Sequence, residues 1–229
     1  MRNQILACSL FLFLVLAGCS HMGSSVSQKL EPEMSHLVVH QRPELKKSQD
    51  RTVVKPLHKS PSDLQVMFFP FYVSDQAGGN FDSGRIVGRI FWRTWLQEKV
   101  FPAMEFEDLP KWPGSNGLRR IAREKGADLY VQGQLSHYME GGTQGRSSVS
   151  MLVNIYTVPQ NELIWSMEHS GRLERQAGKD FILFKTKSWM PEHPMYLLVN
   201  NLAQDLAREV KQWSQTQQVS TPDQFALEP

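Results

Sequence analysis

Residues 121–133 have the sequence IAREKGADLYVQG, which joins the end of a helix directly to the start of a strand. Before the junction, Leu118 and Ala122 lie four residues apart on one helical face, and Gly126 is typical of the residue that follows a helix. After the junction, residues 127–139 alternate apolar and polar side chains, which is the period of a strand. The stretch predicts a domain in which helices pack on a sheet.

Two further strands follow the junction. Residues 147–158 alternate in the same way, and residues 163–173 return after the loop at 159–162. A loop of this length, with Pro and Asn, suits a β-hairpin. The three segments predict an antiparallel meander.

Alternating helices and strands flank the meander. The segments are a buried strand at 64–72, helices at 86–101 and 117–125, a strand at 104–109 and a last helix at 194–215. Ser83 is a plausible cap for the first helix, and Pro102 is expected to stop it. The predicted fold class is α/β: one domain over residues 63–215, a mixed sheet with an antiparallel meander, helices packed on it, and a long C-terminal helix.

The N-terminus has the pattern of a secretory signal. An apolar run at residues 5–16 is too short to span a bilayer, which takes roughly 20 residues. The run ends in LAGC (residues 16–19), which resembles the lipobox of bacterial lipoproteins. The resemblance implies removal of residues 1–18 and lipidation of Cys19, so a membrane is the first expected partner. Ser20, where an aspartate would favour the inner membrane, favours the outer one; an ordinary signal peptide with an incidental cysteine is the alternative.

The segments outside the domain are polar. Residues 19–62 are predicted to be the lipidated cysteine and a flexible tether, spanning roughly 35 Å as a random coil. Within it, the pieces 37–39 and 52–54 are long enough for at most an edge strand. Residues 174–192 are predicted to be irregular, and residues 216–229 form a polar tail.

Composition and motifs argue against several function classes. The formal net charge of +2, with both signs mixed, gives no electrostatic case for nucleic acid. Cys8 lies in the signal and Cys19 is expected to carry lipid, so neither of the 2 cysteines is left for a disulfide, a nucleophile or a metal. The sequence has no phosphate-loop or nucleophile-elbow motif. We expect no cofactor, no metal and no catalytic residue.

Two histidines are the remaining candidates for catalysis. His137 and His169 fall in the predicted meander, where their side chains could face each other across the sheet. A hydrolase would need a cleft in which histidine and carboxylate groups converge. The sequence does not display that pattern, so both are interpreted as polar residues of the sheet.

Three tryptophans are candidates for protein contacts. Trp92 points away from the apolar stripe of its helix, and Trp112 and Trp189 lie in loops that contain proline. Exposed tryptophans are typical anchors of protein interfaces. The alternative is that each folds back as a lid on the core.

Arginines recur on the same helix. Arg85, Arg89 and Arg93 are spaced by four residues, which places them on one face. We interpret this face as solvated, with contact to a partner or an anionic polymer as the second reading. The candidate partner-binding residues are therefore Arg85, Arg89, Trp92, Trp112 and Trp189.

Three segments together resemble a known domain. They are VMFFPF at residues 66–71, the junction at 121–133, and the pair VNIY at 153–156 with ELIWS at 162–166. These features resemble the TolB-N-terminal-like (anticodon-binding-like) domain of bacterial envelope lipoproteins, the group that includes CsgG, PelC and LpoB. The resemblance implies a non-enzymatic role as an adaptor, an activator or a ring-forming export component.

The sequence therefore predicts an outer-membrane lipoprotein that works through protein contacts. The first hypothesis is an accessory component of an envelope export or assembly machine, with an envelope protein as partner and a homo-oligomer as one possible state. The alternative is a tethered monomeric activator of a peptidoglycan synthase. A ring would bury a heterologous interface repeatedly, whereas an activator would stay monomeric.

Overall fold

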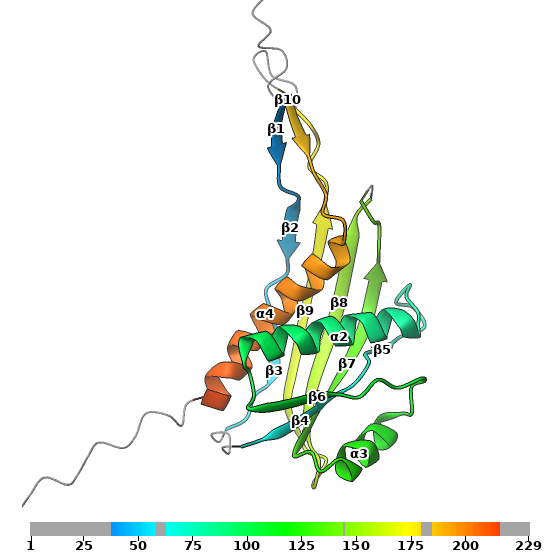
Figure 1. Cartoon of the computed structure of the whole chain (residues 1–229), viewed down its shortest axis with the longest axis vertical. Coiled ribbons are helices and arrows are strands. Elements are labelled where there is room, and N and C mark those ends of the chain that lie inside the picture. Colours follow the sequence, from blue (N-terminus) through cyan, green and yellow to red (C-terminus); the bar gives the residue numbers. More distant parts are fainter. Residues whose placement is uncertain (1–37, 58–62, 144, 180–184, 216–229) are drawn as a thin grey trace, which may run out of the picture. The chain divides into compact units, whose positions relative to one another are not determined.

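The computed structural model describes residues 38–57, 63–143, 145–179 and 185–215 (Figure 1). The chain divides into two compact units, one made of residues 1–39 with 179–186 and the other of residues 40–178 with 187–229. In the first unit, Thr186 is buried and donates its backbone N–H to the carbonyl of Lys179 at 2.8 Å. Strands β1 (Val38–Gln41) and β10 (Lys185–Ser188) pair as a two-stranded sheet.

The second unit holds an α/β domain built on an eight-stranded mixed sheet. The strand order is β2-β9-β8-β7-β4-β6, with β3 also on β9 and β5 on β7. The strands are β2 (Glu44–Lys47), β3 (Arg51–Val54), β4 (Gln65–Phe68), β5 (Tyr72–Val73), β6 (Ala103–Phe106), β7 (Leu129–Met139), β8 (Ser147–Thr157) and β9 (Leu163–Glu174). The described helices are α2 (Phe81–Glu98), α3 (Ser115–Glu124) and α4 (Pro194–Gln215). The predicted fold class, with its meander and long last helix, is confirmed.

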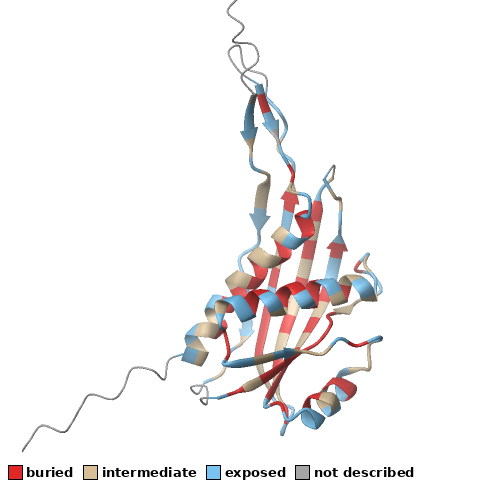
Figure 2. Ribbon diagram, viewed as in Figure 1, coloured by how far each residue is buried: buried red, intermediate tan, exposed pale blue. Residues whose placement is uncertain are grey.

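The helices cover the two faces of the sheet unequally. Strand β4 is parallel to both β6 and β7, and β7, β8 and β9 are antiparallel neighbours. The chain passes from β4 to β6 through α2, and then from β6 back past β4 to β7 through α3. Because crossovers between parallel strands are right-handed, these two opposite directions place α2 and α3 on opposite faces of the sheet. One core cluster unites α2 and α4 with the apolar face of the meander, and a smaller cluster holds α3 against Met67, Phe69 and Tyr130. Figure 2 shows buried residues alternating along β7, β8 and β9.

Helix α2 packs unusually close to the chain beneath it. A Cβ at Gly84 would lie 2.0 Å from the carbonyl oxygen of Phe71, and the N–H of Phe71 donates to the carbonyl of Gly84 at 3.0 Å. Only glycine permits this approach. The helix is capped by Asn80, with Ser83 as the reciprocal partner in a capping box, so the predicted cap was three residues late. It ends before Pro102, because Lys99 adopts a left-handed conformation.

The structure adds strands within residues 19–62, which the sequence predicts to be a flexible tether. Residues 44–47 and 51–54 form β2 and β3, both antiparallel to β9, with a bulge at Val53. The apolar piece at 52–54 thus provides the edge strand that its length permits. Ion pairs fasten this edge: Lys46 contacts Glu174 at 3.1 Å and Lys47 contacts Asp205 at 2.5 Å. Residues 1–37, with Cys19, and the tail at 216–229 lie outside the described residues.

Candidate partner-binding groove

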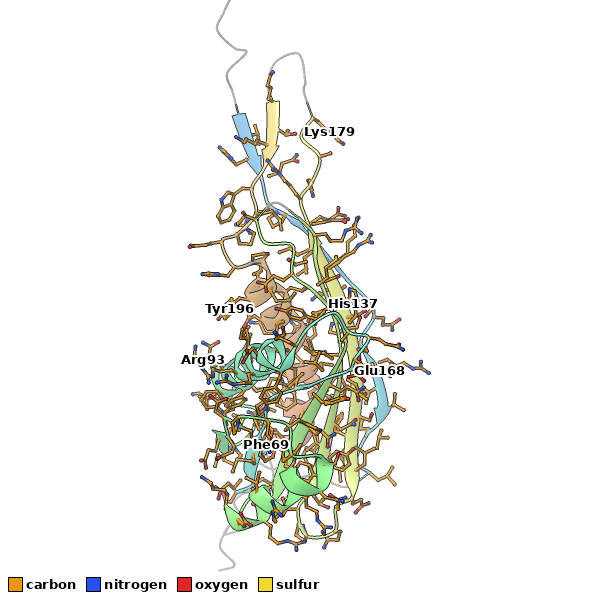
Figure 3. All side chains as sticks on the ribbon, turned by 90° about the vertical axis from the view of Figure 1, so that its right-hand side faces the viewer. Phe69, Arg93, His137, Glu168, Lys179 and Tyr196 are labelled. Atoms are coloured by element: carbon orange, nitrogen blue, oxygen red, sulfur yellow. The ribbon has the colours of Figure 1, made fainter. Side chains whose placement is uncertain are left out.

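The arginine face of α2 borders a groove. Arg85, Arg89 and Arg93 line a cavity of about 610 Å³ between α2, the start of α4 and the end of β7. We call it the α2–α4 groove. Figure 3 shows Arg93 and Tyr196 on the helical side of the domain, away from His137 and Glu168 on the far side of the sheet. The four-residue spacing read from the sequence therefore marks one wall of a concave surface.

Apolar side chains form the rest of the groove. Ile90 and Met195 are buried in its floor, whereas Ile86 and Tyr196 are 55% and 47% exposed at its sides. Tyr138 is buried there, and its hydroxyl donates to Glu140 Oε2 at 2.8 Å. Burial raises the pKa of Tyr138 to about 12, so this hydroxyl remains a donor at neutral pH. Exposed apolar groups framed by charges are the usual composition of an interface.

The arginines differ in how their charges are satisfied. Arg85 donates from Nε and Nη2 to Asp108 at 3.0 and 3.1 Å, and also contacts Asp82. Arg89 shares the same Asp108 carboxylate. The hydrogen bond from Arg85, aided by Arg89, holds the pKa of Asp108 below its ordinary value. Arg93, in contrast, is exposed and has no ion pair with any described residue.

The predicted tryptophans do not gather at the groove. The ring of Trp92 lies 5.9 Å from that of Phe106, and its Nε1–H donates to the carbonyl of Met104 at 3.5 Å. Trp112 folds back to 5.3 Å from the ring of Tyr72. Both are half-buried, as the lid interpretation states, whereas Trp189 is 61% exposed. Their partner-binding role stays a prediction.

The two histidines do not face each other, which corrects the expectation for the meander. His137 pairs with Ser150 and His169 with Met151, so the two project to opposite faces. The exposed His137 hydrogen-bonds with Ser148 at 2.8 Å. Among the described residues, no group of three His, Cys, Asp or Glu side chains is placed to hold a metal ion.

His169 belongs to a buried contact that fixes the β2–β3 turn. Its Nε2 lies 3.0 Å from Asp205 Oδ2 and its Nδ1 lies 3.4 Å from Ser48 Oγ. Ser48, His169 and Asp205 are therefore connected in that order through the imidazole ring, and Ser48 and His169 line a cavity of about 440 Å³. The Ser48 hydroxyl also accepts from the N–H of Ser170 at 3.1 Å and donates to its carbonyl at 3.2 Å. The hydroxyl is thus held by backbone on both sides, and the contact ties the turn to β9 and α4.

Sequence reasoning missed the apolar part of the groove. Ile86 begins the helix that the sequence predicts at 86–101, and the structure leaves it exposed on the arginine side. Tyr196 was given no role. The signal for Ile86 was its position one residue after Arg85 and three before Arg89, which puts it on their face rather than on that of Val87 and Phe91.

The chain was compared with known proteins at the level of sequence and of structure. No family model matches the sequence, and no curated protein matches it. Solved structures with a similar fold include a PelC dodecamer from Paraburkholderia phytofirmans, which is 11% identical over 74% of this chain and 97% of that one, with a TM-score of 0.45. Lipoprotein GNA1162 from Neisseria meningitidis is 11% identical over 64% of this chain and 99% of that one, with a TM-score of 0.36. The LpoB C-terminal domain from Escherichia coli is 12% identical over 46% of this chain and 81% of that one, with a TM-score of 0.31. PelC and LpoB belong to the group that the sequence segments resemble. A likeness of fold does not establish a function, which is argued below from the chain's own residues.

Proposed function

We propose that this protein is a lipid-anchored component of the bacterial outer membrane that serves an export or assembly machine as a non-enzymatic accessory. Cys19 is its anchor, and the domain faces the periplasm. The α2–α4 groove is its contact surface for another envelope protein.

The observation that carries the proposal is the combination of exposed Ile86 and Tyr196 with the arginine wall in one concavity. Tyrosine and arginine are enriched among the residues that dominate binding energy, and such residues cluster in pockets that can be desolvated. Within the described residues, no helix is both long and apolar enough to cross a membrane. In this proposal the lipobox provides membrane attachment and the groove provides partner recognition.

A photocrosslinking residue placed at position 86 tests the contact in intact cells. Leu96 offers a matched control, because it lies on the same helix and is 45% exposed, but does not line the groove. We expect a covalent adduct with another envelope protein from position 86 and none from position 96. Equal labelling at both positions, or none at 86, contradicts the proposed contact surface.

The anchor is tested separately. Cys19→Ser removes the lipid attachment site, and we expect the protein to move from the membrane fraction to the soluble periplasmic fraction. A change of this kind leaves the domain intact, so its circular dichroism spectrum serves as the control. Retention in the membrane fraction after sucrose-gradient separation contradicts lipid anchoring.

A further inference from the structure

The α2–α4 groove sets three requirements for its occupant. The exposed Ile86 and Tyr196 call for apolar side chains, and the groove is large enough, at about 610 Å³, for a short peptide. Arg93, which has no ion pair with any residue that the structure describes, calls for a carboxylate. A lysine or arginine in the occupant would meet the arginine wall as a like charge.

One segment of this chain meets all three requirements. Residues 216–229 have the sequence TQQVSTPDQFALEP and contain none of the 25 Lys and Arg residues. Phe225 and Leu227 supply apolar side chains, and Asp223 and Glu228 flank them with carboxylates. No described element uses this segment, because α4 ends at Gln215.

Geometry favours a groove on another copy over the segment's own. Helix α4 starts at the groove and its 22 residues carry Gln215 about 33 Å away. Phe225 follows Gln215 by about ten residues, which reach at most about 36 Å when fully extended. Docking within one copy would therefore stretch the segment almost to its limit, and the tail of a second copy meets no such demand.

We propose that the α2–α4 groove receives the acidic C-terminal segment, residues 222–228, of a second copy of this chain. The inference rests on the proposed function in that it names one occupant for the same groove. Tail and groove are different surfaces, so the contact is heterologous and joins copies head to tail, into a ring where the rotation closes.

The test uses the lipidated chain in detergent and a form that stops after Gln215, which keeps every described element. A fluorescent peptide of residues 216–229 is titrated against the shortened chain and followed by anisotropy. We expect saturable binding that Arg93→Glu weakens about tenfold or more, because the peptide's carboxylate would then face a negative side chain instead of a positive one. Arg120→Glu is the matched control, since this exposed arginine on α3 lies outside the groove. Light scattering should give more than one copy for the full chain and one copy for the shortened chain.

Three results would overturn the inference. The peptide does not bind the shortened chain; it binds equally well to Arg93→Glu; or the full chain is a single copy whose groove rejects the peptide, which means that its own tail fills it. A peptide with Phe225→Ser and Leu227→Ser should not compete, and competition by it also contradicts the apolar contact. If the peptide fails to bind while position 86 still crosslinks to another envelope protein, the proposed function stands and only this occupant is wrong.

Discussion

The two faces of the meander have opposite chemistry on the same three strands. On the face covered by α2 and α4, Val149, Met151, Val153 and Ile155 are almost completely buried. On the other face, beyond α3, the same strand presents Ser148, Ser150, Leu152 and Asn154, which are half-buried. The period of two assigns each residue to one face, so hydrophobic burial determines where the helices pack.

The covered face is also where the groove forms. Helices α2 and α4 pack tightly over the middle of the sheet, but Ile86 and Tyr196 remain exposed at its border. The open face has a different irregularity: the acceptor oxygens of Gln132 and Asn154, which are directly opposed on β7 and β8, are buried without a hydrogen bond from any described residue. The packing that stabilises the fold is thus concentrated on the face covered by α2 and α4. Substitutions on either face should differ in their effect on the free energy of unfolding.

The largest effect is expected at the centre of the covered face. Trp95 is fully buried against Phe68, Phe91 and Phe101, and its Nε1–H donates to the carbonyl of Ala203 at 3.0 Å. Trp95→Ala should lower the free energy of unfolding by about 3–5 kcal/mol, measured by urea denaturation. Gln134→Ala on the open face is the control and should cost less than about 0.5 kcal/mol. Similar losses at both sites would contradict the contrast between the faces.

The next effect concerns how closely α2 approaches the sheet. Alanine is a better helix former than glycine by about 1 kcal/mol, so propensity alone favours Gly84→Ala. The new methyl would however meet the carbonyl of Phe71, a backbone atom that cannot swing away. We expect a net loss of about 1–3 kcal/mol in thermal or urea unfolding. A stabilised variant would mean that α2 can move away from the Phe71 carbonyl without a loss in the free energy of unfolding.

A third effect depends on pH. Burial of Asp205 acts to raise its pKa, but hydrogen bonds from Lys47 and His169 outweigh burial and hold the pKa below its ordinary value. A carboxylate with a depressed pKa stabilises the fold at neutral pH, and this contribution is lost as the pH falls below about 4. Asp205→Asn should therefore cost about 1–2 kcal/mol at pH 7. The difference from the parent should shrink as urea titrations are carried below pH 4, and a constant gap would exclude the ionised carboxylate as its source.

The smallest effect has the opposite sign. Asn154→Val removes a buried acceptor that no described residue satisfies and adds a β-branched residue in a strand, so we expect a gain of about 0.5–1 kcal/mol. Asn161→Val is the contrasting variant. Asn161 lies in a hairpin loop with a φ of 61°, which a β-branched residue rarely adopts, so this variant should be less stable than the parent. A loss at position 154 in urea unfolding would show that the open face carries a hydrogen bond to water that matters for the fold.

The sequence predicted the architecture because its alternations are long. Residues 129–139, 147–157 and 163–174 each carry several periods, and the Gly126 turn with φ of 73° follows its helix as expected. The edge strands β2 and β3 carry too few residues for a period, and their pairing depends on Asp205, His169 and Glu174, which are far away in the chain. Such tertiary contacts leave no local pattern.

The candidate site was predicted in part. The arginine spacing located one wall of the groove, because a helical period is a local property. The opposite wall comes from α4, and no pattern in residues 81–98 indicates which residue of α4 will lie beside them. The burial of Trp92 could not be predicted for a related reason: it depends on Phe106 in β6, whose position the helix does not encode.

The pairing of β2 with β9 brings the start of the folded domain closer to the N-terminus. Under the proposed anchoring at Cys19, the chain from Cys19 to Glu44 reaches at most about 90 Å when fully extended, against at most about 160 Å from Cys19 to Leu64. The half-sphere of periplasm that the domain can search shrinks about fivefold, and its local concentration at the membrane surface rises in proportion. A partner standing close to the membrane is thereby met more often, and one deep in the periplasm is placed out of range.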